Sequence, residues 1–309
     1  MTWFKRKQPC GHVALTFTDN KVDMVVVEQR DQQPYVRLCL SGQTDTSENR
    51  DRYISDHITS HHLSDTYCTT LLNPDDYNVL LTEAPQVEED ELRDAVRWRI
   101  KDLIPYAVEE AVLDIYKVPN TGTGNRTSNV YAVTARKSAV QACAQQLKSA
   151  GLSLDTIDIH DMAQRNIAAL LPQDQDGVML LALDQHSGLI TITRQGEIYL
   201  RRALDVGTKA LDTSEDSSNM RERVVLEVQR SVDYYDSHFR MAPISDLFIV
   251  PISPLPERVL QSIKVNLNLN VALLPLQELF SVAEEVDAEA LVNSYWALGA
   301  ALRFAGATQ

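Results

Sequence analysis

The sequence predicts an α/β protein with two lobes of similar order, one of them carrying a small inserted α+β unit. Each half of the 309-residue chain opens with a meander of three β-type segments and continues with alternating helical and extended patterns. A chain of this length is expected to form two domains, or one large bilobed domain, with an ample buried core.

The first half begins with valine- and leucine-rich runs that predict three strands, at residues 13–17, 24–27 and 35–40. Turn candidates separate them at Asp19-Asn20 and Gln32-Gln33-Pro34. A polar stretch over residues 41–65 follows and is interpreted as an insertion. Two further strand-like runs come after it, at residues 68–72 and 79–81.

The clearest local pattern is a helix that a proline stops. Apolar residues recur every three or four positions between Glu89 and Ile104, at Leu92, Val96, Ile100, Leu103 and Ile104. Pro105 ends this helix because it cannot donate a backbone hydrogen bond and disfavours helical geometry at Ile104. A strand is predicted next, over residues 112–116.

The inserted unit continues with a glycine-rich turn at 121–125, a strand at 130–135 and a helix at 138–150. Gly151 is expected to close that helix in a left-handed conformation. A strand over 154–159 and a helix starting near Asp161, which is expected to cap it, then lead to the second lobe.

The second lobe opens with a predicted meander at 178–183, 188–193 and 197–204, with Gly196 in a hairpin turn. A helix over 220–238 has Val224, Val228, Val232 and Tyr235 in register. The remaining predicted elements are a strand at 247–250, a helix at 257–267, a strand at 271–274 and an apolar terminal helix at 289–304.

Bulk properties exclude several functional classes. The formal net charge of -14 and the pI near 4.9 argue against nucleic acid, which requires a concentrated basic surface. No apolar run approaches the roughly 20 residues that cross a bilayer, and the basic start lacks the apolar core of an export signal. We therefore expect a cytoplasmic protein whose scattered cysteines (Cys10, Cys39, Cys68 and Cys143) are reduced and buried.

Several short motifs together resemble the PilM family, the actin-like cytoplasmic proteins of type IV pilus assembly. The first is the Trp98-Arg99 helix that ends in Ile104-Pro105-Tyr106, followed by Glu109-Glu110-Ala111 and the strand residue Asp114. The others are Ala135-Arg136-Lys137, Ala150-Gly151-Leu152, the run from Glu227 to Tyr235 (E-x-x-R-S-x-D-Y-Y) and the run from Ala297 to Arg303. The resemblance covers nearly the whole chain. The short basic start resembles the branch that serves the mannose-sensitive haemagglutinin (MSHA) pilus.

The resemblance implies an actin-like fold of the FtsA/PilM type, with two lobes and an inserted small α+β subdomain. The expected divisions are 1–84 for the first lobe, 85–154 for the inserted subdomain and 155–174 for the return to the first lobe. The second lobe is expected at 175–286, with a smaller helical part at about 207–245. The terminal helix, 287–309, is expected to return to the first lobe.

Members of this family bind ATP through three loops, and all three are altered here. The first loop carries Asp-x-Gly followed by a lysine, and the matching positions are Thr16, Thr18 and Asp23. The magnesium-holding carboxylate and the glycine are missing, and a negative charge replaces the lysine. That charge is expected to repel a polyphosphate.

In the second loop Asp184 is retained, but His186 occupies the place of the glycine. We interpret Asp184 as an ordinary turn carboxylate. The third loop, normally Gly-Gly, is replaced by Pro251-Ile252-Ser253-Pro254, whose prolines lack N–H donors. The resemblance therefore implies no catalysis and no cofactor, with Mg-ATP binding as the alternative.

Two other candidate sites are weaker. His57, His61 and His62, with Asp56, Asp65 and Cys68, could be drawn as a zinc site, but a solvated polar helix explains their spacing better. Trp3-Phe4-Lys5-Arg6-Lys7 could touch an anionic membrane weakly, since each positive charge contributes about 1 kcal/mol. No metal site is expected.

The resemblance implies a non-catalytic adaptor that docks on the cytoplasmic N-terminal tail of a PilN-like inner-membrane protein. An extended peptide would bury a few apolar anchors in a groove of the 85–154 unit or pair along a strand edge. The alternatives are an active actin-fold ATPase and the cytoplasmic part of a type II secretion L protein, which continues into a transmembrane helix.

Overall fold

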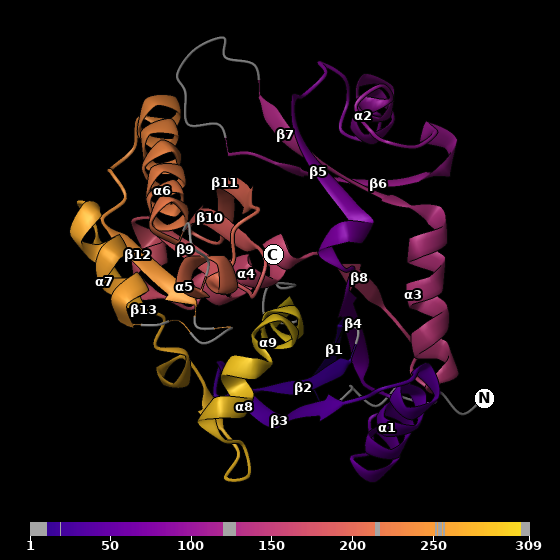
Figure 1. Cartoon of the computed structure of the whole chain (residues 1–309). Coiled ribbons are helices and arrows are strands. Elements are labelled where there is room, and N and C mark those ends of the chain that lie inside the picture. Colours follow the sequence, from indigo (N-terminus) through magenta and orange to yellow (C-terminus); the bar gives the residue numbers. More distant parts are fainter. Residues whose placement is uncertain are drawn as a thin grey trace. The chain divides into compact units, whose positions relative to one another are not determined.

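The computed structural model describes residues 11–18, 20–119, 128–213, 217–250, 252, 255 and 257–303, which form two compact units (Figure 1). Unit 1 comprises residues 1–73, 139–163 and 280–309, and unit 2 comprises residues 74–138 and 164–279. Among the helices of these described ranges, none is both long and apolar enough to cross a membrane.

Unit 1 is built on a six-stranded sheet in the order β14-β3-β2-β1-β4-β8. The strands are β1 (His12–Thr18), β2 (Lys21–Arg30), β3 (Gln33–Gln43), β4 (Tyr67–Leu71), β8 (Thr156–Asp158) and β14 (Ser281–Val282). The first three form the expected antiparallel meander, and β4 and β8 add in parallel.

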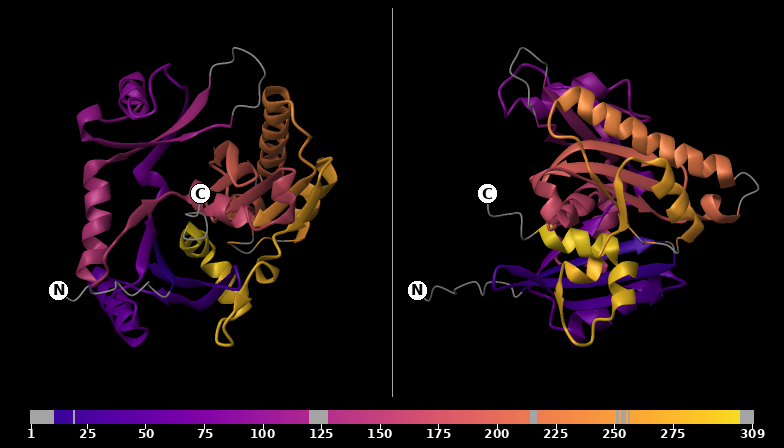
Figure 2. Two further views of the ribbon diagram at one scale, coloured as in Figure 1. Left: turned by 180° about the vertical axis from the view of Figure 1, so that it is seen from behind. Right: turned by 90° about the vertical axis from the view of Figure 1, so that its left-hand side faces the viewer.

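Helices cover both faces of this sheet (Figures 1 and 2). They are α1 (Ser47–Ser60), α3 (Lys137–Ser149), α8 (Ala288–Asn293) and α9 (Tyr295–Ala301). Helix α4 (His160–Ala168) begins in unit 1 and ends in unit 2. The stretch 41–65, interpreted from its polarity as an insertion, contains α1, whose Ile54 and Ile58 are buried in the core beneath the sheet. Thr46 caps this helix, with its hydroxyl accepting from the amide of Asn49 at 3.1 Å.

Unit 2 contains a five-stranded sheet in the order β11-β10-β9-β12-β13. Its elements are β9 (Val178–Leu183), β10 (Gly188–Arg194), β11 (Glu197–Leu204), α5 (Thr208–Thr213), α6 (Ser217–Phe239), β12 (Asp246–Val250), α7 (Glu257–Asn266) and β13 (Asn270–Leu273). Short 3-10 turns lie at Pro74–Asp76, Val108–Glu110, Pro172–Gln175 and Leu276–Glu278. The orange α6 lies along the sheet in the right panel of Figure 2, burying Val224, Val228 and Tyr235 as their spacing predicts.

The β10–β11 hairpin turns through Gln195 and Gly196, both with positive φ (53° and 75°), which matches the twist of paired strands. Gly151, at φ 87°, closes α3 as predicted. Helix α4 begins at His160, two residues earlier than a cap by Asp161 would require, so Asp161 lies in the first turn of the helix.

Unit 2 also contains a small sheet in the order β5-β7-β6, from β5 (Tyr77–Glu83), β6 (Ala111–Lys117) and β7 (Asn129–Arg136). Helix α2 (Leu92–Ile100) covers one face. Leu92, Val96 and Ile100 are buried there as predicted, but Leu103 is 62% exposed. The helix ends at Ile100, and the following turn directs Ile104 into the core in place of Leu103.

The other face of this small sheet shares a core with the five-stranded sheet. Tyr131 and Val118 lie in the same buried cluster as β9, β10 and α6. The Tyr131 hydroxyl accepts the backbone N–H of Arg201 at 3.2 Å, and its ring stacks on Tyr116 at 4.9 Å between centroids. The small sheet therefore groups with the second lobe in unit 2, whereas the sequence assigned the inserted subdomain to the first lobe.

Three expected boundaries differ from those observed. The small sheet starts before residue 85, because β5 pairs with β7 along its whole length. Most of α3 lies in unit 1, because Leu147 is buried beneath the six-stranded sheet. The return to unit 1 begins at Phe280, not at 287, because β14 pairs with β3.

The terminal helix is broken in two. Ser294 separates α8 from α9 with φ -106° and ψ 22°, so the continuous helix expected over 289–304 does not form. Helix α9 packs on β1, β2 and β4 with nearly all of its residues buried. Gly299 lets α9 also lie close to α4, since a Cβ atom there would be 2.3 Å from the carbonyl oxygen of Ala163 in α4.

We expect Gly299→Ala to lower the free energy of unfolding by about 3 kcal/mol, because the added methyl group overpacks a backbone contact. Urea denaturation measures the change. Gly151→Ala is the matched control, because its Cβ meets nothing within 4 Å and only the positive φ opposes it, at about 1 kcal/mol. Equal losses in both variants would contradict the close α4–α9 packing.

Candidate functional site

The candidate nucleotide residues are divided between the two units. In unit 1, Thr16 on β1 stands directly opposite Asp23 on β2, and both are buried. Thr18 is exposed at the end of β1, where its carbonyl oxygen accepts from Arg50 at 3.1 Å.

Asp23 is held inside unit 1 by an ion pair with Lys21. Their Oδ1 and Nζ atoms are 2.9 Å apart, and Ser294 donates its hydroxyl to the same carboxylate at 3.4 Å. Lys21 also donates to the carbonyl oxygen of Asn293 at 2.8 Å. These contacts fasten β2 to the junction between α8 and α9.

The Lys21 contact bears on the expectation that Asp23 repels a polyphosphate. Strand alternation puts Lys21 and Asp23 on the same face of β2, so the cation neutralises the carboxylate from within the strand. Burial raises the pKa of Asp23, and Lys21 partly opposes that rise. Burial also raises the pKa of the neighbouring Cys39 thiol to about 11, which makes that thiol inert.

In unit 2, the loop Asp184–Ser187 forms a tight exposed turn. The amide of Asp184 donates to the carbonyl of Ser187 at 2.9 Å, and the amide of Gln185 donates to the Asp184 carboxylate at 2.7 Å. The carboxylate therefore orders its own turn. His186 lies exposed at the position where a phosphate loop would have glycine.

The start of α5 packs against this turn through Gly207. A Cβ atom at Gly207 would lie 2.4 Å from both the Asp184 carbonyl oxygen and the His186 amide nitrogen. The next two amides, of Thr208 and Lys209, donate to the carbonyls of Asp184 and Gln185 at 2.8 and 3.1 Å. The amides of Asp184, Gln185, Thr208 and Lys209 are thus bound to protein oxygens and not to a phosphate.

The third loop, with Pro251 and Ser253, lies outside the described residues. So do the N-terminal residues considered for membrane contact (Trp3, Phe4, Lys5, Arg6 and Lys7), the glycine-rich turn at 121–125, and Cys10. Among the cysteines that are described, Cys39 and Cys68 are buried, Cys143 is half-buried, and none forms a disulfide.

The residues considered for zinc do not converge. His57 and His61 stack on successive turns of α1, 5.8 Å between ring centroids, while Cys68 is fully buried on β4. Over the described ranges no group of three or more histidine, cysteine or carboxylate residues is placed to hold a metal ion.

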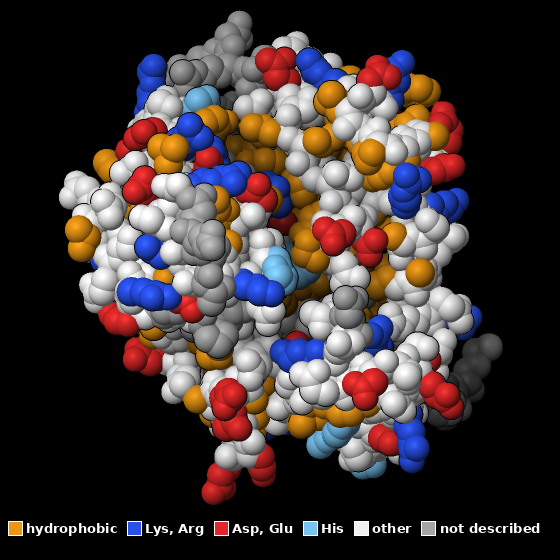
Figure 3. Space-filling view, in the orientation of Figure 1, with side chains coloured by type: hydrophobic (Ala, Val, Ile, Leu, Met, Phe, Trp, Pro, Cys, Tyr) orange, Lys and Arg blue, Asp and Glu red, His pale blue; other side chains and the backbone are white. Residues whose placement is uncertain are grey.

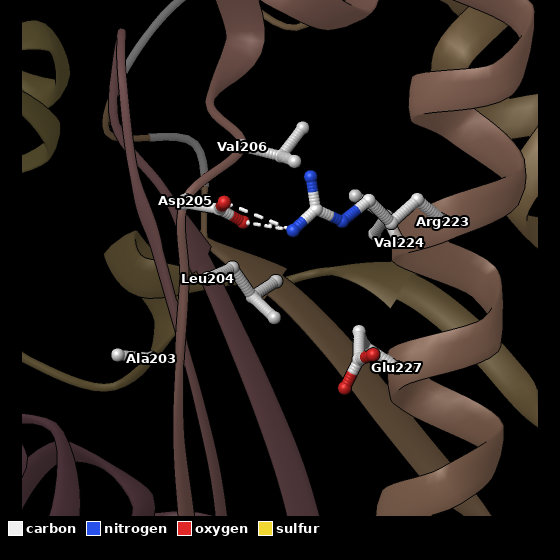
Figure 4. Close-up of a pocket in the computed structure, with 7 residues that line it drawn as sticks. All are labelled: Ala203, Leu204, Asp205, Val206, Arg223, Val224 and Glu227. Carbon is white, nitrogen blue, oxygen red and sulfur yellow. Dashed lines mark hydrogen bonds and ion pairs between the residues drawn. The ribbon is translucent and has the colours of Figure 1, made fainter.

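A cavity of about 190 Å³ lies between β11 and α6 within unit 2 (Figure 4). Each of its three charged lining residues forms an ion pair. Arg223 binds Asp205 at 2.7 Å, and Glu227 binds both Arg202 and Arg230. The hydrogen bond from Arg202 lowers the pKa of Glu227, so the carboxylate stays charged and paired rather than poised for proton transfer.

The E-x-x-R-S-x-D-Y-Y motif has a structural role that its sequence did not reveal. Glu227 joins α6 to β11 through Arg202 and to the next helical turn through Arg230. The Ser231 hydroxyl donates to the Glu227 carbonyl at 2.7 Å, and Tyr235 is wholly buried. The motif fixes the long helix on the sheet.

Comparison with known proteins places these features in context. A family model described as type IV pilus assembly protein PilM matches residues 79–216, which include the small sheet, α2 and the β9–β11 meander. No curated protein sequence matches the chain.

Solved structures show the fold. The chain is similar to a structure titled PilM-PilN type IV pilus biogenesis complex, at 18% identity and a TM-score of 0.72, covering 96% of this chain and 98% of that one. A Bacteroides thetaiotaomicron protein of unknown function with an actin-like ATPase fold gives 10% identity, a TM-score of 0.50 and coverages of 94% and 98%. The cytoplasmic domain of EpsL, from the type II secretion system of Vibrio cholerae, has 12% identity and a TM-score of 0.49, with coverages of 92% of this chain and 93% of that one. The chain has an actin-like fold.

Lys21→Met should lower the free energy of unfolding by about 2–3 kcal/mol at neutral pH, because a buried carboxylate loses its cation. Adding Asp23→Asn should restore most of that loss. The folded pKa of Asp23 lies above its unfolded value, so the ionisation penalty exists above the folded pKa and disappears as pH falls through it. The loss in Lys21→Met should therefore shrink in acid.

Chemical denaturation between neutral pH and about pH 4 tests this, a window that reaches the ordinary carboxyl range. Arg52→Met is the matched control, because its pair with Asp56 is 82% and 72% exposed and contributes at most about 0.5 kcal/mol. A Lys21→Met loss as small as that of Arg52→Met, or one that persists unchanged in acid, would contradict the buried ion pair.

Proposed function

We propose that this chain is a non-catalytic adaptor of type IV pilus assembly that docks on the cytoplasmic N-terminal tail of a PilN-like inner-membrane protein. The supporting observation is its likeness, over almost the whole chain, to PilM in a PilM–PilN complex. The PilM family match over residues 79–216 points the same way. We further propose the MshI type, which serves the MSHA pilus, on the short basic start of the sequence.

The docking surface proposed for the tail is the face of the small sheet that points away from α2. The strand register places Leu81, Val133 and Val112 on a diagonal across its three strands. Leu81 and Val112 are 45% and 40% exposed, and Val133 is half-buried between them. A diagonal apolar stripe suits an extended peptide, whose alternate side chains point to one side.

Absence of catalysis is part of the proposal. The Asp184 turn and the α5 amides are bonded to one another, and Asp23 is paired with Lys21. An ATPase requires free amides and a magnesium-holding carboxylate at these places. The alternative of an actin-fold ATPase therefore has less support than an adaptor without nucleotide or metal.

The second alternative is a component like the type II secretion L protein, which would bind a different membrane platform. A pull-down from membranes in mild detergent separates the two, since each predicts a different captured protein. We place the chain at the cytoplasmic side of the inner membrane, held by its partner, with at most weak direct contact through Trp3, Phe4, Lys5, Arg6 and Lys7.

Mg-ATP should leave the melting temperature unchanged. A ligand at 100 times its dissociation constant would add about 2.7 kcal/mol of stability, which a thermal melt detects easily. Millimolar Mg-ATP and inorganic phosphate are compared side by side. A reproducible rise with ATP alone would show that the altered loops still hold nucleotide.

A synthetic peptide of the cytoplasmic N-terminus of the PilN-like protein encoded with this chain should bind with micromolar affinity, near -8 kcal/mol. Leu81→Asp or Val112→Asp should weaken binding by about tenfold or more, since each apolar contact contributes about 1.5–3 kcal/mol. Isothermal titration measures both. Moderate salt should change the affinity of this apolar tail only slightly.

Val265→Asp is the control for this titration, because Val265 on α7 is 81% exposed and remote from the small sheet in sequence and strand order. A variant of the peptide with aspartate at its apolar positions is the control that tests whether the apolar side chains of the peptide are needed for binding. Equal binding by the native and aspartate peptides, or no heat with either, would refute this docking mode.

A further inference from the structure

Helix α2 carries an unusually exposed tryptophan on the face that points away from the small sheet. Trp98 is 64% exposed, and Leu103 just beyond the helix is 62% exposed. Figure 3 shows hydrophobic side chains at the upper right, over α2 and β6, intermixed with charged ones. Large aromatic side chains are normally buried or placed at interfaces, so this face is a candidate contact surface.

The arginines of α2 are turned toward the sheet and are already used. Arg93 pairs with Asp114 at 3.1 Å, and Arg99 pairs with Glu83 at 3.3 Å. Arg97 donates to the carbonyls of Val108 and Ala111 at 3.4 and 3.3 Å. Arg93 and Arg99 are thereby drawn away from the outer face, whereas Arg97 also lies 3.9 Å from Asp94.

What remains around Trp98 is mainly negative. At 100° per residue, Asp94 shares the outer face of α2 with Trp98, and the exposed carboxylates of Glu91 and Asp102 lie just before and just after the helix. The Asp94 side chain is 83% exposed, and its Oδ1 atom lies 3.9 Å from the Nε atom of Arg97. Glu91 and Asp102 form no ion pair within the described residues. Lys101 and Arg97 are the cations beside these residues, so three carboxylates face two positive charges.

We propose that this outer face of α2 binds a lysine- and arginine-rich segment of the membrane partner, the segment next to its transmembrane helix. A guanidinium or ammonium group would stack on the Trp98 ring while the carboxylates pair with its neighbours. Cytoplasmic segments that flank transmembrane helices are rich in lysine and arginine, which gives the occupant its chemistry. This inference rests on the proposed adaptor function and names a second contact for it.

The charge of this face favours a basic protein segment over lipid. Anionic headgroups would be repelled by the carboxylates beside Trp98, whereas a basic peptide gains from both the ring and the charges. The face lies on the opposite side of the small sheet from the Leu81–Val112 stripe, so the two contacts do not compete. Helix and sheet together are roughly 20 Å thick, so a tail bridging both needs roughly ten residues between its segments.

The test is titration of the full chain with two synthetic peptides from the PilN-like protein: its apolar N-terminal tail, and its basic segment next to the membrane. Trp98→Ala should weaken binding of the basic peptide about threefold, the size of an exposed cation–π contact. The pair Asp94→Asn and Asp102→Asn should weaken it about tenfold in about 30 mM salt and much less in about 300 mM salt, where screening is strong.

Matched controls separate α2 from general effects. Glu284→Gln with Glu285→Gln removes the same charge from exposed residues of unit 1, and Val265→Ala trims an apolar residue that is 81% exposed on α7. Neither should change binding of the basic peptide. Thermal melts of all variants verify folding, which exposed substitutions should leave intact.

The outcomes are distinguishable. If the apolar tail binds but the basic peptide does not, or if the α2 variants bind it as the controls do, the inference is wrong and the adaptor function stands. If neither peptide binds, both fail. Trp98-dependent binding to phosphatidylglycerol vesicles without peptide binding would assign the face to the membrane and would also overturn the proposal.

Discussion

The small three-stranded sheet depends on being covered on both faces. An isolated sheet of this size is marginal in water, and helix α2 covers only one side of it. The second cover comes from Tyr131 and Val118, which enter the core of the five-stranded sheet, and from the hydrogen bond between Tyr131 and Arg201. Because that cover is partial, a diagonal of apolar residues stays accessible. The stability and the proposed docking surface of the sheet thus have the same origin.

Local patterns predicted most elements correctly because the signals for them lie within a few residues. The glycine at 151 and the valine register of α6 each act over one or two turns, whereas α2 ends at Ile100, before the stop predicted from Pro105. The predictions of features that depend on residues far away in the sequence were wrong. The expected terminal helix breaks at Ser294, which contacts Asp23 across 271 positions, and residues 41–65 fold into the core through Ile54 and Ile58.

The candidate site shows the same division. The resemblance singled out Thr16, Thr18, Asp23 and His186 in the sequence, but it did not predict that Asp23 is paired with Lys21. Strand alternation could have paired Asp23 with Lys21, two positions away, and that signal was missed. Nothing local indicates that Gly207 lies against the Asp184 turn, since that contact exists only after α5 has packed.

That contact has a consequence for control. The Asp184 turn and the start of α5 are joined by backbone hydrogen bonds, and the missing Cβ at Gly207 lets them touch. In GTPases the γ-phosphate orders the switch segments, and its loss on hydrolysis releases them. Here the Asp184 turn and the start of α5 are held together by hydrogen bonds of the polypeptide itself. An adaptor of the proposed kind would not be timed by nucleotide hydrolysis, and the fraction of it that is bound would depend only on the concentrations of its partners.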